Sequence, residues 1–401
     1  MKICAALAAF TGLLLATSAI SAQSAPADGW VGAWGYATSP ATKSVADTLP
    51  AGTYRYRIRS SQSGNALRFL LTNPDGAQSL QIVSMNVARA AAKDGFAIDP
   101  AQSRQIGFAD GPLLTLPGGG TMQTQPVQLN VRAGEDLVVS IVTSAPSTTV
   151  AGNAGFPVAF AAGTVDATGA ALATVKLRPL VSQLAVHNDA AKCTIVTFGD
   201  SITEGARGTR ADWRGWPGVL ARRLIEAGSG PHCGVVNMGI SGNRLLRDGR
   251  GTAGVDRLER DVASVPGVTH LIVLEGVNDI WRSTLPGETP IAVADLIAGY
   301  RKIIAFGHAR GVRVIGGTIT PGSGWKAYNA GMEQIRQDTN LWIRTAGEFD
   351  AVIDFDAALR DTSTPPAVKP AFDSGDHLHP GNGGYEAMGR AVPLSLFRGS
   401  R

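Results

Sequence analysis

Hydrophobic and polar side chains alternate along the first half of the chain, from Trp30 to about Ala185. In TYRYRIRS (residues 53–60) the tyrosines and the isoleucine fall on one side of an extended chain and the arginines on the other, as in a half-buried strand. ALRFLLTN, SLQIVSMNVA, VQLNVRAG and DLVVSIVTS repeat this pattern between turn sequences such as NPDG and PGGG. The alternation predicts an all-β sandwich domain of jelly-roll type over residues 28–186.

The pattern changes after about residue 190, where short apolar runs alternate with amphipathic segments. The runs CTIVTFG, GVVNMGI, THLIVLEG, VRVIGGTI and AVIDFD are predicted strands. Helical periodicity occurs between them, in residues 216–228, 255–262, 290–300 and 333–343. Strands that are almost wholly apolar and joined by helices predict an α/β domain over residues 190–400, with a five-stranded parallel sheet covered on both faces.

The first 22 residues have the pattern of a secretory signal peptide. One lysine precedes an Ala- and Leu-rich apolar run, and small residues follow it up to Ala22. The run is too short for a membrane anchor. The sequence therefore predicts an exported protein, periplasmic or extracellular, without a membrane anchor.

Charge is sparse and nearly balanced. Charged residues make up 17% of the chain and the formal net charge is +4. No run of Lys and Arg exceeds two residues. A nucleic-acid partner is therefore not expected.

Polar residues suited to catalysis follow the predicted strands of the second half. Ser201 follows the first strand, the glycines of GISGN follow the second, Asn278 follows the third, and the segment DSGDHLHPGN comes after the fifth. The carboxyl ends of parallel strands meet at one edge of a sheet. By itself Ser201 fits two roles, because a serine at a strand-to-helix junction is a good helix N-cap as well as a potential nucleophile.

The partners of Ser201 favour the nucleophile. Asp376 and His379 are three residues apart, so one turn of chain can supply an imidazole base and the carboxylate that orients it. A hydroxyl, an imidazole, an acid and N–H donors for an oxyanion are what acyl transfer needs.

The blocks GDS (199–201), ISGN (240–243), GVND (276–279) and DHLH (376–379), in this order, resemble the four blocks of the SGNH hydrolases, also called the GDSL lipase/esterase superfamily. The resemblance covers about residues 190–400. NRLLRDG, LEGVNDI and SGDHLHP further resemble a secreted bacterial arylesterase/acylhydrolase-like subgroup with an N-terminal β domain. Ile202 replaces the leucine of the GDSL block, a substitution that conserves volume.

The resemblance implies a flavodoxin-like three-layer fold and a role for each matched residue. Ser201 would be the nucleophile, His379 the general base and then acid, and Asp376 its orienting carboxylate. The backbone N–H groups of Ser201 and Gly242 and the side-chain amide of Asn278 would form the oxyanion hole.

The predicted function is that of a secreted serine esterase that uses no metal and no cofactor. Its expected substrates are small-molecule or polysaccharide esters, and deacetylation of carbohydrate is favoured. Lysophospholipase, arylesterase or thioesterase activity would use the same site. A non-catalytic glycan-binding protein on a hydrolase fold is the alternative of a different class. The sequence does not predict the oligomeric state.

Other polar and aromatic residues near the blocks have structural interpretations. His377 is expected to be a loop histidine that contacts backbone, because no further His/Cys cluster accompanies it as a metal site would require. Asp200 and Asp279 are expected to hold loop N–H groups, and Asp354 and Asp356 to hold the Asp376 loop. Trp281 and Trp325 follow the third and fourth strands, where they could line the substrate cleft or anchor loops.

Cys193 and Cys233 are the cysteines that would remain after removal of the leader. They lie eight and nine residues before Ser201 and Gly242, so both should reach the opposite edge of the sheet. If their strands are neighbours, the Cα separation falls near the range that a disulfide tolerates. A Cys193–Cys233 disulfide is predicted, and two buried free thiols are the alternative.

Overall fold

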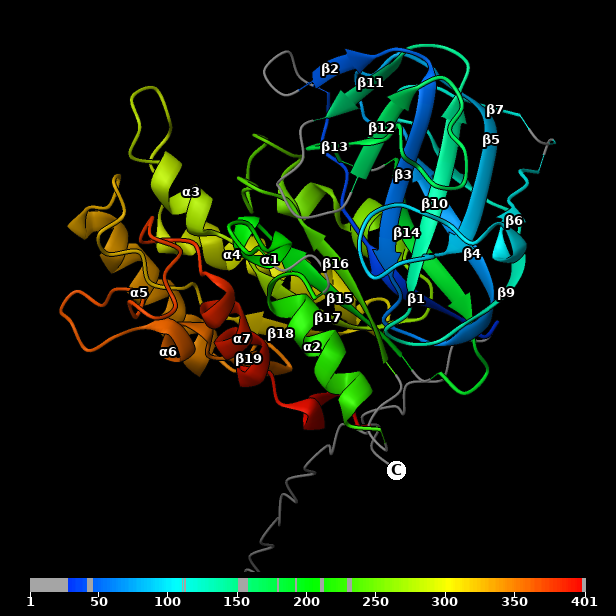
Figure 1. Cartoon of the computed structure of the whole chain (residues 1–401). Helices are drawn as coiled ribbons and strands as arrows, with labels where there is room; N and C mark the ends of the chain where they lie inside the picture. The colour runs from blue at the N-terminus through cyan, green and yellow to red at the C-terminus, as the bar shows by residue number, and fades with distance from the viewer. Residues whose placement is uncertain are drawn as a thin grey trace, which may run out of the picture.

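The computed structural model describes residues 28–41, 46–109, 111, 113–150, 158–178, 180–191, 193–209, 213–228 and 233–398. The predicted leader, residues 1–22, lies outside them. Figure 1 shows two parts that pack side by side, a β-rich region drawn mainly in blue to cyan and an α/β domain drawn in green to red. We refer to them as the β region and the α/β domain.

The β region is built from antiparallel sheets. One has the strand order β1-β14-β4-β8 with β9 also paired to β4, and the other has the order β13-β12-β3-β10-β5-β6 with β7 also paired to β5. β11 and β2 pair in a separate two-stranded antiparallel sheet. The strands are β1 (Trp30–Gly35), β2 (Ala46–Leu49), β3 (Gly52–Arg59), β4 (Gly64–Thr72), β5 (Leu80–Arg89), β6 (Arg104–Gln105), β7 (Leu114–Leu116), β8 (Thr121–Gln123), β9 (Val127–Val131), β10 (Asp136–Thr143), β11 (Ser147–Val150), β12 (Val158–Ala162), β13 (Ala173–Val175) and β14 (Val181–His187).

The core of the β region comes from the alternating positions of its strands. Tyr54, Tyr56 and Ile58 of β3 are at most 2% exposed and belong to one hydrophobic cluster with Leu67 and Phe69 of β4. These strands lie in different sheets, so the cluster joins the two sheets face to face. The predicted period-two pattern therefore marks the inward face correctly.

The α/β domain contains a five-stranded parallel sheet with the order β16-β15-β17-β18-β19. The order places the first strand between the second and third, as in flavodoxin-like folds. Its strands are β15 (Cys193–Gly199), β16 (Cys233–Gly239), β17 (Val268–Leu274), β18 (Arg313–Gly317) and β19 (Ala351–Ile353), and its α-helices are α1 (Ser201–Glu204), α2 (Gly215–Glu226), α3 (Val277–Arg282), α4 (Val293–His308), α5 (Ala330–Thr345), α6 (Phe355–Leu359) and α7 (Asn382–Ala391). None of the described helices is both long and apolar enough to cross a bilayer.

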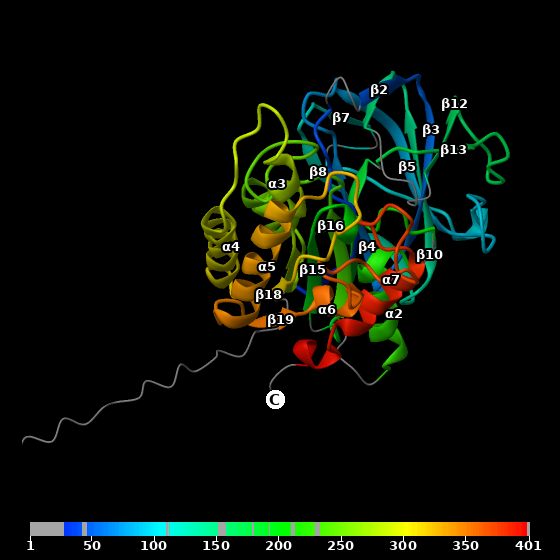
Figure 2. The same ribbon diagram turned by 90° about the vertical axis from the view of Figure 1, so that its left-hand side faces the viewer.

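Helices cover both faces of this sheet. Figure 2 shows α4 and α5 on one side of β15 and β18, and α2 and α7 on the other. Successive residues of β15 enter different clusters, because Val196 packs toward α4 and α5 whereas Ile195 packs toward α2 and α7. The domain therefore has three layers.

One predicted helix is not regular. Residues 255–262 have helical periodicity, but the structure has a 3-10 turn at Gly254–Asp256 and a π-helical turn at Glu259–Ala263. Arg257 lies between these turns with its side chain fully buried, where it donates to the carbonyls of Met238 and Gly199. We attribute the irregularity to this inward-pointing side chain. Helical periodicity does not predict the buried partners of an arginine.

The β region and the α/β domain share a close junction along β1 and β16. A Cβ on Gly234 of β16 would lie 1.9 Å from the carbonyl oxygen of Gly32 in β1, so the two backbones touch. The Gly32 N–H donates to Thr194 Oγ1 at 2.9 Å, and the Val235 N–H donates to Ser61 Oγ at 2.8 Å. Strand-to-strand contact of this kind ties the β region directly to the sheet.

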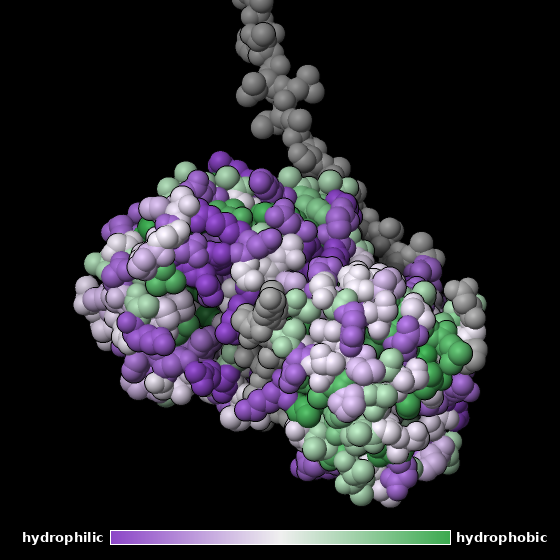
Figure 3. All heavy atoms as spheres, turned by 90° about the horizontal axis from the view of Figure 1, so that it is seen from above, coloured by the Kyte–Doolittle hydropathy of each residue, from purple (hydrophilic) through white to green (hydrophobic). Residues whose placement is uncertain are grey.

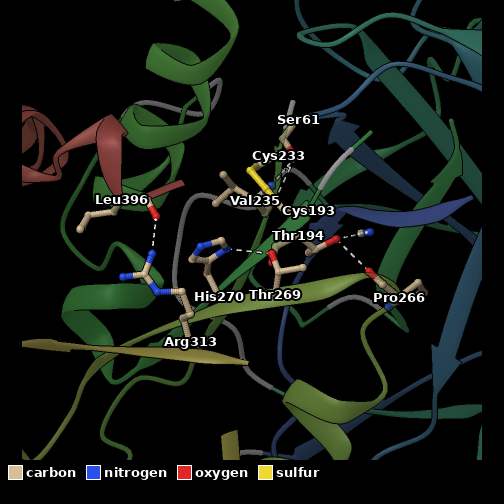
Figure 4. Close-up of a disulfide and its surroundings, with 11 residues drawn as sticks. Ser61, Cys193, Thr194, Cys233, Val235, Pro266, Thr269, His270, Arg313 and Leu396 are labelled. Atoms are coloured by element: carbon tan, nitrogen blue, oxygen red, sulfur yellow. Dashed lines mark hydrogen bonds between the residues drawn. A yellow bond between two sulfur atoms is a disulfide. The ribbon is translucent and has the colours of Figure 1, made fainter. Parts of the chain in front are cut away.

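A disulfide joins Cys193 and Cys233 at the start of β15 and β16. The two residues are direct partners in the register of the parallel pair, and their Cα atoms are 4.5 Å apart. Figure 4 shows the bond near Thr194, which contacts the β region, and near Ser61, which belongs to the β region. Ser201 follows the opposite end of β15, so the bond is remote from it.

We expect reduction of Cys193–Cys233 to lower the melting temperature and leave kcat nearly unchanged. The bond closes a separation of 40 residues, and a loop of that length stabilises a fold by about 3 to 4 kcal/mol through the entropy of the unfolded chain. Thermal unfolding and ester hydrolysis should be compared with and without reductant, and in a Cys193→Ala/Cys233→Ala variant. Mass spectrometry that finds both thiols alkylated without prior reduction would contradict the bond.

Candidate active site

Ser201 lies at the end of β15, where the chain turns into α1. The preceding Asp200 is the N-cap of this short helix, and its Oδ1 accepts the Ile202 N–H at 2.8 Å. The cap function therefore belongs to Asp200, which leaves the Ser201 hydroxyl free for another partner. Ser201 Oγ is 2.8 Å from His379 Nε2.

His379 and Asp376 lie in the loop between α6 and α7. His379 Nδ1 is 2.8 Å from Asp376 Oδ2. The other carboxylate oxygen, Oδ1, accepts the backbone N–H groups of His379 at 2.8 Å and Leu378 at 3.1 Å. The turn holds the carboxylate at one edge of the imidazole ring and leaves Nε2 directed at Ser201. The structure thus brings the three residues together in one hydrogen-bonded chain.

The Asp376 carboxyl is strongly acidic. Its partial burial would raise its pKa, but the hydrogen bonds from the backbone and ring of His379 outweigh that effect and lower the pKa to about 2. Arg207 Nε, on a side chain that is 64% exposed, is 3.2 Å from Asp376 Oδ2. Asp376 is therefore an anion at every pH near neutrality. Arg207 could not be identified from the sequence, because nothing in its sequence context points to residue 376.

Gly242 lies in the loop after β16 with φ of +74°, a left-handed conformation that favours glycine. A Cβ there would also lie 2.8 Å from Cδ of Arg250. Among the described residues, neither the Gly242 N–H nor the Ser201 N–H donates to another protein group. Both N–H groups are thus available to a ligand.

Asn278 is the second residue of α3, directly after the turn that ends β17. Its side-chain amide donates one hydrogen to the carbonyl of Asn243 at 2.9 Å, and the residue is 8% exposed. An amide has two N–H hydrogens, so the second remains for an oxyanion. The bond also ties Asn278 to the residue after Gly242, which holds two of the predicted donors together.

Arg257 supports the loop that carries Gly242 and Asn243, and its role could not be read from the sequence. Its Nε donates to Asn243 Oδ1 at 2.8 Å, and its Nη2 donates to the carbonyl of Gly199 at 3.0 Å. Its charge is balanced by the Asp261 carboxylate at 2.8 Å, and Glu275 Oε2 lies 3.6 Å from Nη2. One buried guanidinium thus connects the end of β15 to the loop that carries Gly242.

Asp200 and Asp279 hold loop N–H groups, as expected. Besides the Asp200 cap, the Asp279 carboxylate accepts the N–H groups of Leu245 at 2.6 Å and Leu246 at 3.0 Å. Burial raises the pKa of Asp200 to about 7, and the nearby Asp279 adds to the rise. Burial raises the pKa of Asp279 to about 6 and that of Glu275 well above its usual range.

The raised pKa of Asp200 predicts that stability falls as the pH rises from about 4 to 7. In that interval the folded state keeps a proton that the unfolded state has lost, so a higher pH favours unfolding. Each unit between the folded and unfolded pKa is worth about 1.4 kcal/mol. Asp200→Asn keeps an oxygen for the Ile202 N–H, and its melting temperature should therefore fall less between pH 5 and pH 8 than that of the wild type.

The exposed Asp338→Asn serves as the control for this measurement, because its melting curve should follow the wild type. Parallel melting temperatures for the Asp200→Asn variant and the wild type across the range would contradict the assignment.

The remaining predicted residues lie near the site but differ from expectation in detail. Trp281 and Trp325, expected either to line the substrate cleft or to anchor loops, stack on each other with ring centroids 3.5 Å apart and pack, partly buried, against the hydrophobic core of the α/β domain. His377 pairs through Nδ1 with the Asp373 carboxylate at 2.7 Å, not with backbone. Among the described residues, no group of three or more His, Cys, Asp or Glu side chains is arranged to hold a metal ion.

The expectation that Asp354 and Asp356 hold the Asp376 loop is wrong. Asp354 pairs with Arg344 at 2.8 Å, and Asp356 pairs with Arg336 at 2.7 Å, both arginines of α5. These acids anchor α5 to α6. The loop is held by its own residues, since Asp373 Oδ1 accepts the N–H groups of Gly375 and His377.

The chemistry open to this arrangement is proton transfer from a hydroxyl with stabilisation of a nearby anion. A serine hydroxyl bonded to a histidine that is oriented by a carboxylate can lose its proton as it attacks a carbonyl carbon. The free N–H groups of Ser201 and Gly242 and the amide of Asn278 provide donors at the same edge of the sheet.

A known protein family matches most of the α/β domain. Residues 197–387 match the GDSL-like Lipase/Acylhydrolase family. The matched range contains all the blocks from Ser201 to His379. No curated protein matches the chain.

Several solved structures resemble about half of this chain at low identity. A GDSL-like lipase from Bacteroides thetaiotaomicron VPI-5482 is 18% identical over 49% of this chain and 84% of its own, with a TM-score of 0.38. An acetyl xylan esterase from Geobacillus stearothermophilus is 23% identical over 50% and 93%, with a TM-score of 0.39. An α/β hydrolase from the metagenome of Lake Arreo, Spain, is 24% identical over 50% and 94%, with a TM-score of 0.40.

Proposed function

Because residues 197–387 match the GDSL-like Lipase/Acylhydrolase family, we propose that this protein is a serine esterase in which Ser201, His379 and Asp376 hydrolyse carboxylic esters through an acyl-enzyme. The observation that carries the proposal is the continuous chain from Ser201 Oγ to His379 Nε2 and from His379 Nδ1 to Asp376 Oδ2, with 2.8 Å at each step.

The proposed reaction has two steps. Ser201 Oγ attacks the ester carbonyl carbon while His379 Nε2 takes the hydroxyl proton. The tetrahedral oxyanion accepts hydrogen bonds from the Ser201 and Gly242 N–H groups and from Asn278. His379 then gives the proton to the leaving alcohol, and the acyl group stays on Ser201. A water molecule, deprotonated by His379, releases the acid and restores the serine.

Within this class we propose acetyl or other small-acyl esters of carbohydrate as substrates. The rim is polar, since the Arg207 side chain is 64% exposed beside Asp376 and the exposed Arg250 lies against Gly242. Hydrophilic side chains predominate over the α/β domain on the left of Figure 3. A rim of this kind favours a hydroxylated substrate over a lipid.

The exposed apolar side chains also fit poorly with a lipase. The large exposed hydrophobic residues of the described chain lie in four separate segments, and they are Val83, Leu113, Leu285 and Leu341. None of them lies in the loops that carry Ser201, Gly242 or His379. An enzyme that binds a lipid surface would gather such residues around its site.

Turnover of p-nitrophenyl acetate, butyrate and octanoate, with acetate release from acetylated xylan, tests the proposal. We expect the acetyl esters to be preferred and every activity to depend on Ser201. Preference for octanoate, a lysophospholipid or a thioester would replace the proposed substrate but keep the mechanism. Absence of Ser201-dependent turnover on all esters would leave the glycan-binding alternative.

We also propose that the protein is exported to the periplasm or the medium. The predicted signal peptide of residues 1–22 supports export, and so does the Cys193–Cys233 pair, because disulfides persist in oxidising compartments. The N-terminus of the mature protein, sequenced from fractionated cells, tests the proposal. A protein that keeps residues 1–22 in the cytoplasm would contradict it.

A further inference from the structure

Glu204, the last residue of α1, lies buried where the β region meets the candidate active site. Its side chain is fully buried. Oε2 accepts the backbone N–H of Ser241 at 2.6 Å, and Ser241 directly precedes Gly242. Oε1 accepts from the Tyr36 hydroxyl and, at 3.2 Å, from Arg178 Nη2. One carboxylate thus links the β region to the loop that carries Gly242.

Tyr36 and Arg178 are themselves held firmly in the β region. Tyr36 is 1% exposed and its N–H donates to the carbonyl of Ser182 at 2.9 Å. The Arg178 guanidinium lies 4.8 Å from the centre of the Tyr36 ring and donates to the carbonyl of Ala37 at 2.8 Å. Besides their bonds to Glu204, both residues are therefore held by contacts within the β region.

The protonation states of Tyr36 and Arg178 make both side chains hydrogen-bond donors to Glu204. Burial raises the pKa of Tyr36 far above its usual value, so the phenol stays a neutral donor to Glu204. Burial would lower the pKa of Arg178, but neighbouring acidic groups, among them the Glu204 carboxylate, raise it, and the guanidinium stays charged. Both donors thus point at one oxygen of Glu204, and the second oxygen remains for Ser241.

We propose that Glu204 is a positioning residue for the oxyanion hole, and that Tyr36 and Arg178 of the β region complete the site by fixing it. The carboxylate holds the Ser241 N–H. It thereby fixes the position of the next peptide group, which carries the Gly242 N–H. The inference rests on the proposed function in one respect, the role of Gly242 as an oxyanion donor.

The junction makes such an effect physically reasonable. Gly32 and Gly234 bring the backbones of β1 and β16 into contact, and the Ser61 hydroxyl bonds both Ala33 and Val235. A binding module on a flexible linker would make no such contacts. The β region is therefore part of the active-site framework, in addition to any contact it makes with substrate.

Tyr36→Phe tests the proposal, with Tyr54→Phe as its matched control. Tyr54 is equally buried, at 2% exposed, and its hydroxyl bonds Ser147 within the β region. Each variant loses a buried phenol hydrogen bond, and the loss of melting temperature should be somewhat larger for Tyr36→Phe because its partner is a carboxylate. Only the Tyr36 variant should lower kcat on p-nitrophenyl acetate, by about tenfold with KM nearly unchanged, as a weakened oxyanion donor would.

Two further measurements separate positioning from a general loss of stability. Phenylboronic acid forms an adduct with a serine nucleophile that has an oxygen in the oxyanion position, and its affinity should fall in the Tyr36 variant by about the factor seen in kcat. Hydrogen exchange of the peptide that contains Ser241 should become several-fold faster in that variant alone. Arg178→Lys, which keeps the charge but loses the guanidinium geometry, should show the same changes and serves if Tyr36→Phe does not fold.

Equal kcat, boronate affinity and exchange in the Tyr36 and Tyr54 variants would overturn the inference. The exchange measurement needs no catalysis, so it separates the two proposals. If the wild type has no Ser201-dependent turnover, the proposed function fails, and unchanged exchange around Ser241 is then what overturns the link between Glu204 and the loop.

Discussion

Ser201→Ala is expected to lower kcat/KM on p-nitrophenyl acetate by about a thousandfold or more, because it removes the proposed nucleophile. The fold should be little affected. The hydroxyl has His379 as its bonding partner, α1 keeps its Asp200 cap, and alanine is a good helix residue. Initial rates and thermal unfolding of the same preparation check both parts of the expectation.

The double variant Ser201→Ala/His379→Ala should be no slower than Ser201→Ala alone, since two groups that act as a unit do not add their effects. Ser363→Ala is a suitable control, because this serine lies in an exposed loop where its hydroxyl bonds Asp361. It should keep the full rate. Residual activity within tenfold of wild type in Ser201→Ala would rule out Ser201 as the nucleophile.

The sequence predicted the main site residues because a parallel sheet collects them. Ser201, Gly242 and Asn278 each follow a different strand, and the strand order places those strands next to one another. Their positions at strand ends can be read from apolar runs alone. His379 and Asp376 are close for a simpler reason, since a three-residue spacing within one turn limits their separation.

The disulfide shows how far spacing can take such a prediction. Counting back from Ser201 and Gly242 gave an offset of one residue between the cysteines, whereas the structure pairs Cys193 directly with Cys233. The extra residue lies in the loop after Gly239, where the Asn243 N–H turns back to the carbonyl of Ile240. Loop geometry absorbs the difference, and counting cannot locate it.

The supporting residues could not be predicted, because their partners are far away in sequence. Glu204 meets Tyr36 across 168 residues and Arg178 across 26, and Arg257 meets Gly199 across 58. Alternation tells whether a side chain points inward but not which charge it will meet. Glu204 carries a weak signal, as an acid three residues after a proposed nucleophile, yet an exposed helix residue would look the same.

Asn278→Ala is expected to reduce kcat by about a hundredfold or more while KM stays similar. In the proposed mechanism its second amide N–H faces charge that exists only in the transition state, so substrate binding should not depend on it. The substitution also removes the bond to the Asn243 carbonyl, which should cost about 1 kcal/mol of stability. Kinetics on p-nitrophenyl acetate and thermal unfolding separate the two effects.

The control for this variant is Asn382→Ala. Asn382 is an exposed asparagine whose amide donates to Thr209 Oγ1 at 2.7 Å, so its replacement also removes an amide hydrogen bond. Its kcat should stay within twofold of wild type, on the basis that surface substitutions have small effects. A change in KM alone for Asn278→Ala would mean that the amide binds the substrate ground state. The oxyanion would then be stabilised by the Ser201 and Gly242 N–H groups alone. Loss of the Glu204 contact that positions Gly242 would in that case lower kcat by a larger factor.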